Sequence, residues 1–75
     1  MNGNALKGLI ISKGTNVENF LFSLKGRGVN MSKNSFYRKI KEETQFDRLE
    51  IVAIAAELSM SDETILKIFF DEIVS

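Results

Sequence analysis

The sequence predicts a single compact all-α domain of five short helices that spans residues 1–75. Apolar residues recur at intervals of three and four in several segments, and this is the period of an amphipathic helix. Clusters of Gly, Asn and Ser separate these segments, and the chain contains no Pro. Because 75 residues are too few to build two hydrophobic cores, we expect one domain.

The first helix is expected over Ala5 to Lys13. Its apolar stripe consists of Leu6, Leu9 and Ile10. Gly14 follows directly and suits the left-handed backbone conformation in which many helices end. The first helix should therefore pack one face against the core and stop at this glycine.

The second helix is expected to begin after Asn16, whose side-chain oxygen can accept a free backbone amide, and to end near Lys25. Its inward residues are predicted to be Val17, Phe20, Leu21 and Leu24. We expect Gly26 and Gly28 to break this helix.

The third helix is expected over Ser32 to Lys41. The hydroxyl group of Ser32 can accept the backbone amide of Ser35, which makes Ser32 a good N-cap. Phe36 and Ile40 are four residues apart and are predicted to anchor this helix in the core.

Two further helices are expected after the caps Asp47 and Ser61. The inward residues of the fourth helix are predicted to be Ile51, Ile54, Ala55 and Leu58. The fifth helix carries Asp62 and Glu63 in its first turn, where the helix dipole favours negative charge. Its inward residues are predicted to be Ile65, Ile68, Phe69 and Ile73.

The formal net charge is zero, but the charges are unevenly distributed. Residues 1–41 contain eight Lys and Arg residues and a single acidic residue, Glu18, for a net charge of +7. Residues 42–75 contain two basic and nine acidic residues, for a net charge of −7. Either the basic half binds a polyanion while the acidic half lies on the distal side, or the two halves attract each other within the fold.

The outer face of the predicted third helix is polar and basic once Phe36 and Ile40 are placed inside. Asn and Arg can form paired hydrogen bonds to adenine and guanine, and Lys and Ser can bind base edges or phosphates. We expect the base-reading residues to be Lys33, Asn34, Ser35 and Arg38. The expected phosphate-binding residues are Lys25, Arg27, Tyr37, Lys39 and Lys41. The alternative is that this face is only a solvated helix surface.

Three segments together carry a resemblance to a known family. They are Met31 to Ile40, which reads MSKNSFYRKI, then Gln45-Phe46 with Glu50 to Ser61, and finally Ile68-Phe69-Phe70. In their order they resemble the Cro and phage-repressor-like (XRE-type) helix-turn-helix family, especially its short phage-encoded members. The resemblance implies a five-helix, lambda-repressor-like domain that binds double-stranded operator DNA as a homodimer and regulates transcription.

The segment before the third helix departs from the family pattern. Lys25 to Asn30 lengthens the usual turn of three or four residues by about five, and Leu21 stands where the family prefers a small residue. Lys25 and Arg27 could serve as extra phosphate clamps on this glycine-rich loop. Alternatively, the loop is a tolerated surface insertion, since lengthening a loop costs little free energy.

A protein-binding module is the alternative function. The apolar residues that fall outside the predicted stripes are Phe22, Leu66, Phe70 and Val74. Exposed apolar clusters often mark an interface, so these residues could bind a partner repressor or form a homodimer seam. Alternatively, they complete the core of a small domain.

Catalysis, metal binding and a cofactor are not expected. The chain has no His, Cys or Trp, so it lacks the most common general base, thiol nucleophile and metal ligand. Its carboxylates and its single Tyr show no arrangement of a nucleophile with a partnered base. The N-terminal residues do not resemble a signal peptide, and the apolar run Leu9 to Ile11 is too short to span a membrane. We therefore expect a cytoplasmic protein.

Overall fold

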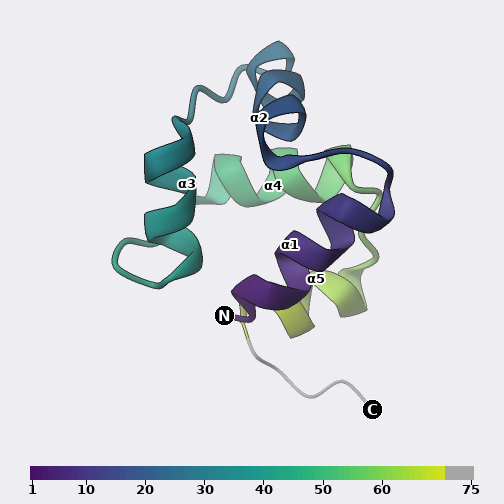
Figure 1. Cartoon of the computed structure of the whole chain (residues 1–75). Coiled ribbons are helices and arrows are strands. Elements are labelled where there is room, and N and C mark those ends of the chain that lie inside the picture. Colours follow the sequence, from purple (N-terminus) through teal and green to yellow (C-terminus); the bar gives the residue numbers. More distant parts are fainter. Residues whose placement is uncertain (71–75) are drawn as a thin grey trace.

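The computed structural model of the chain describes residues 1–70. Within this range it contains five helices and no strand, which confirms the all-α prediction. The helices are α1 (Gly3–Ser12), α2 (Val17–Gly26), α3 (Lys33–Ile40), α4 (Arg48–Glu57) and α5 (Asp62–Phe69). They pack into one compact globule (Figure 1).

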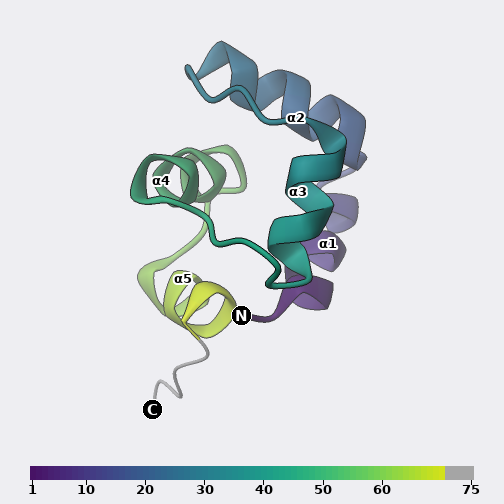
Figure 2. The same ribbon diagram turned by 90° about the vertical axis from the view of Figure 1, so that its left-hand side faces the viewer.

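The helices surround a core to which all five contribute. α2 packs against α1, α3 and α4, and α1 also packs against α5. Figure 2 shows α2 across the top, α3 and α1 on one side, and α4 and α5 on the other. The buried core residues are Leu6, Ile10, Phe20, Leu21, Leu24, Phe36, Ala53, Ile54, Leu58, Ile68 and Phe69.

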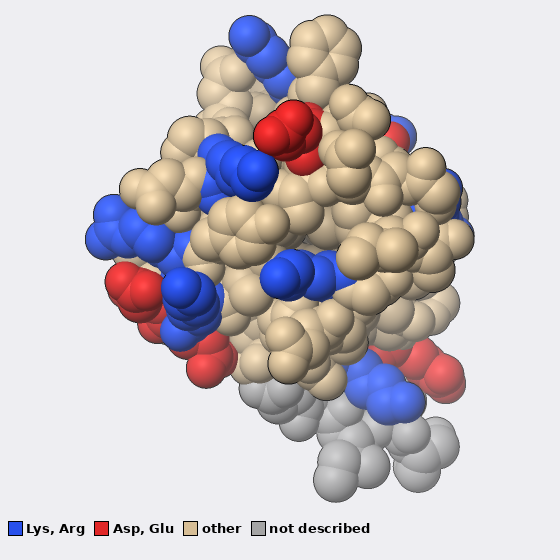
Figure 3. Space-filling model, in the orientation of Figure 1, with Lys and Arg blue, Asp and Glu red and all other residues tan. Residues whose placement is uncertain are grey.

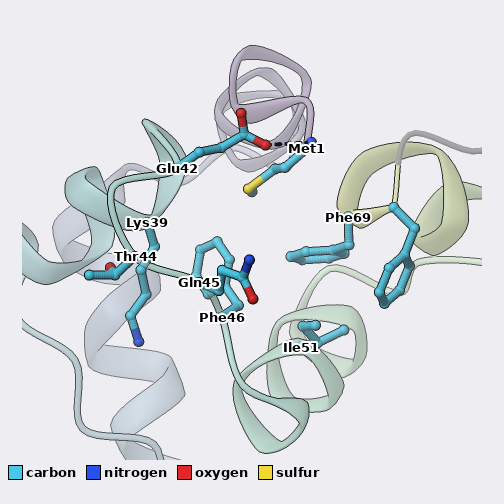
Figure 4. A pocket seen from close by; sticks show the side chains of 9 residues that line it. Met1, Lys39, Glu42, Thr44, Gln45, Phe46, Ile51 and Phe69 are labelled. Atoms are coloured by element: carbon cyan, nitrogen blue, oxygen red, sulfur yellow. Dashed lines mark hydrogen bonds and ion pairs between the residues drawn. The ribbon is translucent and has the colours of Figure 1, made fainter.

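Aromatic contacts run through this core from α2 to α5. The rings of Phe20 and Phe36 lie 6.0 Å apart, and Phe36 lies 6.0 Å from Phe46 in the connection between α3 and α4. Phe46 in turn meets Phe69 edge to face at 5.6 Å, and Figure 4 shows these two rings beside each other. Phe36 has no exposed surface, so it anchors α3 firmly to the rest of the domain.

The four N-caps predicted from the sequence are confirmed. The side chains of Asn16, Ser32 and Ser61 each accept the backbone amide of the residue three positions later. Asp47 accepts the amide of Glu50 at 2.8 Å, and the Glu50 side chain accepts the amide of Asp47 at 2.9 Å. This reciprocal capping box starts α4 at the residue after Asp47.

The predicted start of the first helix at Ala5 is wrong, because α1 begins at Gly3 with Asn2 as its cap. The Asn2 side chain accepts the amide of Ala5 at 3.1 Å, and its own backbone amide donates to the carbonyl of Ile68 at 2.7 Å. The N-terminus is thereby tied to the end of α5. The first turn of α1 also lies against Ile40 at the end of α3, where only a glycine fits at position 3.

Left-handed glycines follow the ends of α1 and α2, as the sequence predicts. Gly14 and Gly28 adopt φ angles of 80° and 89°, in the left-handed region. Gly26, expected to break the second helix, is instead the last residue of α2. The Gly28 and Val29 amides then donate to the Lys25 and Leu24 carbonyls, both at 3.0 Å. The connection to α3 therefore covers residues 27–32.

The ends of α3 and α4 use left-handed residues that are not glycine. Glu42 has a φ angle of 64° and Ser59 a φ angle of 52°. The predicted fifth helix is confirmed as far as Phe69, and Ile73 lies outside the described residues. Among the residues that the structure describes, no helix is long and apolar enough to cross a membrane.

Candidate nucleic-acid interface

The outer face of α3 carries the predicted base-reading residues. Ser32 caps the helix and Phe36 fills the core, so the opposite side of α3 faces solvent. Lys33, Asn34 and Arg38 are exposed, and Ser35 is half-buried. Three of the four predicted readers are thus accessible to a ligand, and Ser35 lies at the edge of the helix face.

One of these residues is already engaged in an ion pair. The Lys33 ammonium group donates to the Glu18 carboxylate at the start of α2, at a distance of 3.2 Å. Both side chains are largely exposed, Lys33 by 55% and Glu18 by 74%. Exposed pairs of this kind contribute little stability and exchange partners readily. Lys33 therefore remains available to a stronger partner.

The predicted phosphate-binding residues differ in their environments. Lys25 and Lys41 are exposed, and no carboxylate of the described residues pairs with them. Arg27 donates from its Nε to Glu57 of α4 at 2.8 Å, and its side chain is 44% exposed. This contact holds the loop after α2 against the end of α4, so the loop is attached to the domain.

Lys39 does not lie on the outer face. Its ammonium group contacts both carboxylate oxygens of Glu50, at 2.7 and 2.6 Å, and only 14% of its side chain is exposed. The same ammonium group lies 5.8 Å from the centre of the Phe46 ring. Lys39 borders a pocket next to the connection between α3 and α4 (Figure 4). We therefore leave Lys39 out of the phosphate-binding set, because its charge is neutralised inside the fold.

Tyr37 is half-buried and forms a contact that the sequence does not reveal. The Lys7 ammonium group of α1 lies 5.3 Å from the centre of the Tyr37 ring, within range of a cation–π interaction. Lys7, Lys33 and Tyr37 line one hollow together with residues of the first turn of α2. Lys7 therefore joins the candidate interface from a different helix.

Basic side chains are spread over the side of the molecule formed by α3 and α1 (Figure 3). Some acidic groups lie among them on the same face, so the acidic half is not confined to the distal side. The ion pairs Arg27–Glu57 and Lys39–Glu50 join the basic and acidic halves of the chain. Attraction between the two halves of the chain thus neutralises the charges of Arg27 and Lys39. The exposed cations Lys25, Arg38 and Lys41 form no ion pair with the described residues.

The predicted interface residues do not form one surface. Phe22 is 78% exposed on α2 and Phe70 is 53% exposed after α5, whereas Leu66 is half-buried. α2 and α5 lie at opposite ends of the molecule (Figure 1). Val74 lies outside the described residues. On α4, Leu49 and Val52 are also exposed, by 76% and 57%, which sequence reasoning missed.

Comparison with protein-family models, with curated proteins and with solved structures gives no match to this chain. Its function is therefore inferred from the residues themselves and their geometry.

Proposed function

We propose that this chain is a cytoplasmic, sequence-specific regulator of transcription that binds double-stranded operator DNA through α3 as a homodimer. In this proposal α2 and α3 form a helix-turn-helix, and α3 enters the major groove. Lys33, Asn34, Ser35 and Arg38 read base edges. Lys7, Lys25, Arg27, Tyr37 and Lys41 hold the phosphates on either side of the groove.

The observation that carries the proposal is the division of α3 into a buried and an exposed side. Phe36 is fully buried, while Lys33, Asn34 and Arg38 are exposed on a helix whose outer face carries no acidic residue. These side chains include the types that bind adenine and guanine with paired hydrogen bonds in the major groove. A helix fixed by a buried aromatic anchor can present them to DNA without rearranging.

The phosphate contacts supply affinity without sequence information. Lys25 and Lys41 are exposed and unpaired among the described residues, and Lys7 comes from a neighbouring helix. Each phosphate that such a cation neutralises releases counterions, so binding should weaken steeply as salt rises. Arg27 can contribute only if DNA competes with Glu57 for its guanidinium group.

A selection from a randomised duplex library tests base reading. The parent protein should enrich a defined sequence, whereas Arg38→Ala and Asn34→Ala should lose that preference and keep weak binding to any duplex. Lys41→Ala is the control, because losing a phosphate contact should weaken binding to all sequences about equally and reduce the salt slope by about 0.9. Failure of the parent to bind any duplex would contradict the proposal.

A second candidate function is binding to a partner protein such as a repressor. The ring of Phe22, 78% exposed on α2, is the observation that favours it, because a partner could bury this aromatic surface. Absence of DNA binding by the parent, together with Phe22-dependent binding to a purified repressor, would support this alternative.

A further inference from the structure

The ion pair between Glu18 and Lys33 joins the first turn of α2 to the first turn of α3, on the proposed DNA-binding helix. Glu18 is the only acidic residue among residues 1–41, and it stands in the first turn of α2. It borders the same hollow as Lys7, Lys33 and Tyr37. A DNA phosphate that approaches this hollow therefore meets one carboxylate beside two cations, Lys7 and Lys33.

We propose that Glu18 is a specificity-determining residue that opposes DNA binding through phosphate contacts alone. This inference rests on the DNA-binding function proposed above. In the free protein the Glu18 carboxylate pairs with the ammonium group of Lys33 at 3.2 Å, so a phosphate that approaches Lys33 has to displace this carboxylate. The Glu18 carboxylate, 74% exposed, also repels any phosphate placed beside it.

The correct base sequence offers Lys33 a partner that can replace Glu18, whereas a phosphate is a poorer replacement. Lys33 can leave Glu18 at little cost, because both side chains are exposed and the pair is weak. On the selected site, Lys33 gains hydrogen bonds to a base edge such as the O6 and N7 atoms of guanine. On random DNA its only new partner is a phosphate, which Glu18 repels. The carboxylate therefore penalises non-specific complexes more than the specific one.

The test compares Glu18→Gln with the parent on two probes, a short random-sequence duplex and the duplex enriched by the parent. Glu18→Gln should bind the random duplex about fivefold more tightly, because one like-charge repulsion is removed. Its salt slope on that duplex should steepen by about 0.9, the value for one additional phosphate contact. Affinity for the enriched duplex should change much less, so the specificity ratio should fall about fivefold.

Glu63→Gln is the matched control. Glu63 is also an exposed residue in the first turn of a helix, α5, and its replacement changes the net charge by the same amount. The proposal is overturned if Glu18→Gln and Glu63→Gln bind the random duplex more tightly by the same factor, because net charge alone would then explain the effect. It is also overturned if Glu18→Gln binds the random duplex no more tightly than the parent. If the parent binds the enriched duplex while either of these results is found, the DNA-binding function stands and only the role of Glu18 fails.

Discussion

The ammonium group of Lys39 lies within 2.7 Å of both carboxylate oxygens of Glu50 and joins the end of α3 to the start of α4. Glu50 has a second role, because its side chain also accepts the backbone amide of Asp47 in the capping box of α4. Only 14% of the Lys39 side chain and 12% of the Glu50 side chain are exposed. This ion pair therefore fixes the orientation of α3 relative to α4, and with it the direction of the proposed reading face.

Lys39→Met should destabilise the domain, because it leaves the Glu50 carboxylate partly buried without its cation. We expect a loss of roughly 2 kcal/mol in the free energy of unfolding, below the range for fully buried pairs since some solvent reaches both groups. Urea unfolding followed by circular dichroism measures this loss. Lys41→Met is the control: Lys41 is exposed and unpaired among the described residues, so its replacement should change stability by less than about 0.5 kcal/mol. Similar losses in both variants would contradict the structural role of the pair.

Gly3→Ala and Gly8→Ala should have opposite effects although both change a glycine of α1 to alanine. A Cβ atom at position 3 would collide with the Ile40 side chain and lie 2.8 Å from the Ile40 carbonyl oxygen, whereas a Cβ atom at position 8 meets nothing within 4 Å. We expect Gly3→Ala to lower the free energy of unfolding by about 1–3 kcal/mol through overpacking. Gly8→Ala should raise it by about 0.5–1 kcal/mol, because alanine loses less backbone entropy in a helix. Thermal unfolding of the two variants measures both changes in stability. If both substitutions stabilise the domain, α1 does not approach α3 as closely as the structure shows.

The helix caps could be predicted from the sequence because they depend on short-range chemistry. Asn16, Ser32, Asp47 and Ser61 each bind an amide three residues away, so the local sequence contains both partners. Asn2 was missed as a cap because the three residues between Met1 and Ala5, Asn2-Gly3-Asn4, include no apolar residue that marks a helical stripe. Its second contact, to the Ile68 carbonyl, depends on how α1 docks on α5, which local patterns do not determine.

In the candidate site, too, the sequence predicts what depends on the local pattern and misses what depends on how the helices pack. The exposure of Lys33, Asn34 and Arg38 follows from placing Phe36 inside, and the helical period predicts it. Lys39 and Lys41 look equivalent in the sequence. Only the position of Glu50 on α4 makes Lys39 part of a partly buried ion pair and leaves Lys41 an exposed cation. The contact of Lys7 with Tyr37 likewise depends on the crossing of α1 and α3.

Phe20→Ala and Phe22→Ala should separate core packing from surface exposure on a single helix. Phe20 is 1% exposed and contacts the ring of Phe36, whereas Phe22 is 78% exposed. Removing the Phe20 ring should cost about 3–5 kcal/mol, enough to unfold a domain of this size in part or completely. Phe22→Ala should change the stability of the monomer by less than about 0.5 kcal/mol. A large loss of stability in Phe22→Ala that depends on protein concentration would instead indicate that Phe22 is covered in a dimer.

Gly26→Ala and Gly28→Ala test whether the segment before α3 is an ordered helix end or a loose loop. Gly28 adopts a φ angle of 89°, and its amide and that of Val29 donate to carbonyls in the last turn of α2, so an alanine at position 28 would be forced into a left-handed conformation. We expect Gly28→Ala to lower the free energy of unfolding by about 1–2 kcal/mol. Gly26 is the last helical residue with open space around it, so Gly26→Ala should be neutral or stabilising by up to about 1 kcal/mol.

Hydrogen exchange of the Gly28 and Val29 amides, measured in the parent, provides an independent check, because ordered amides in these hydrogen bonds should exchange more slowly than free ones. If both alanine variants are neutral and both amides exchange at the rate of an unfolded chain, residues 27–32 form a mobile loop. Lys25 and Arg27 could then reach DNA only at an entropic cost. Protection of both amides, with loss of stability confined to Gly28→Ala, means that these two cations are held at fixed positions at the end of α2, where phosphate contacts need no ordering of the chain.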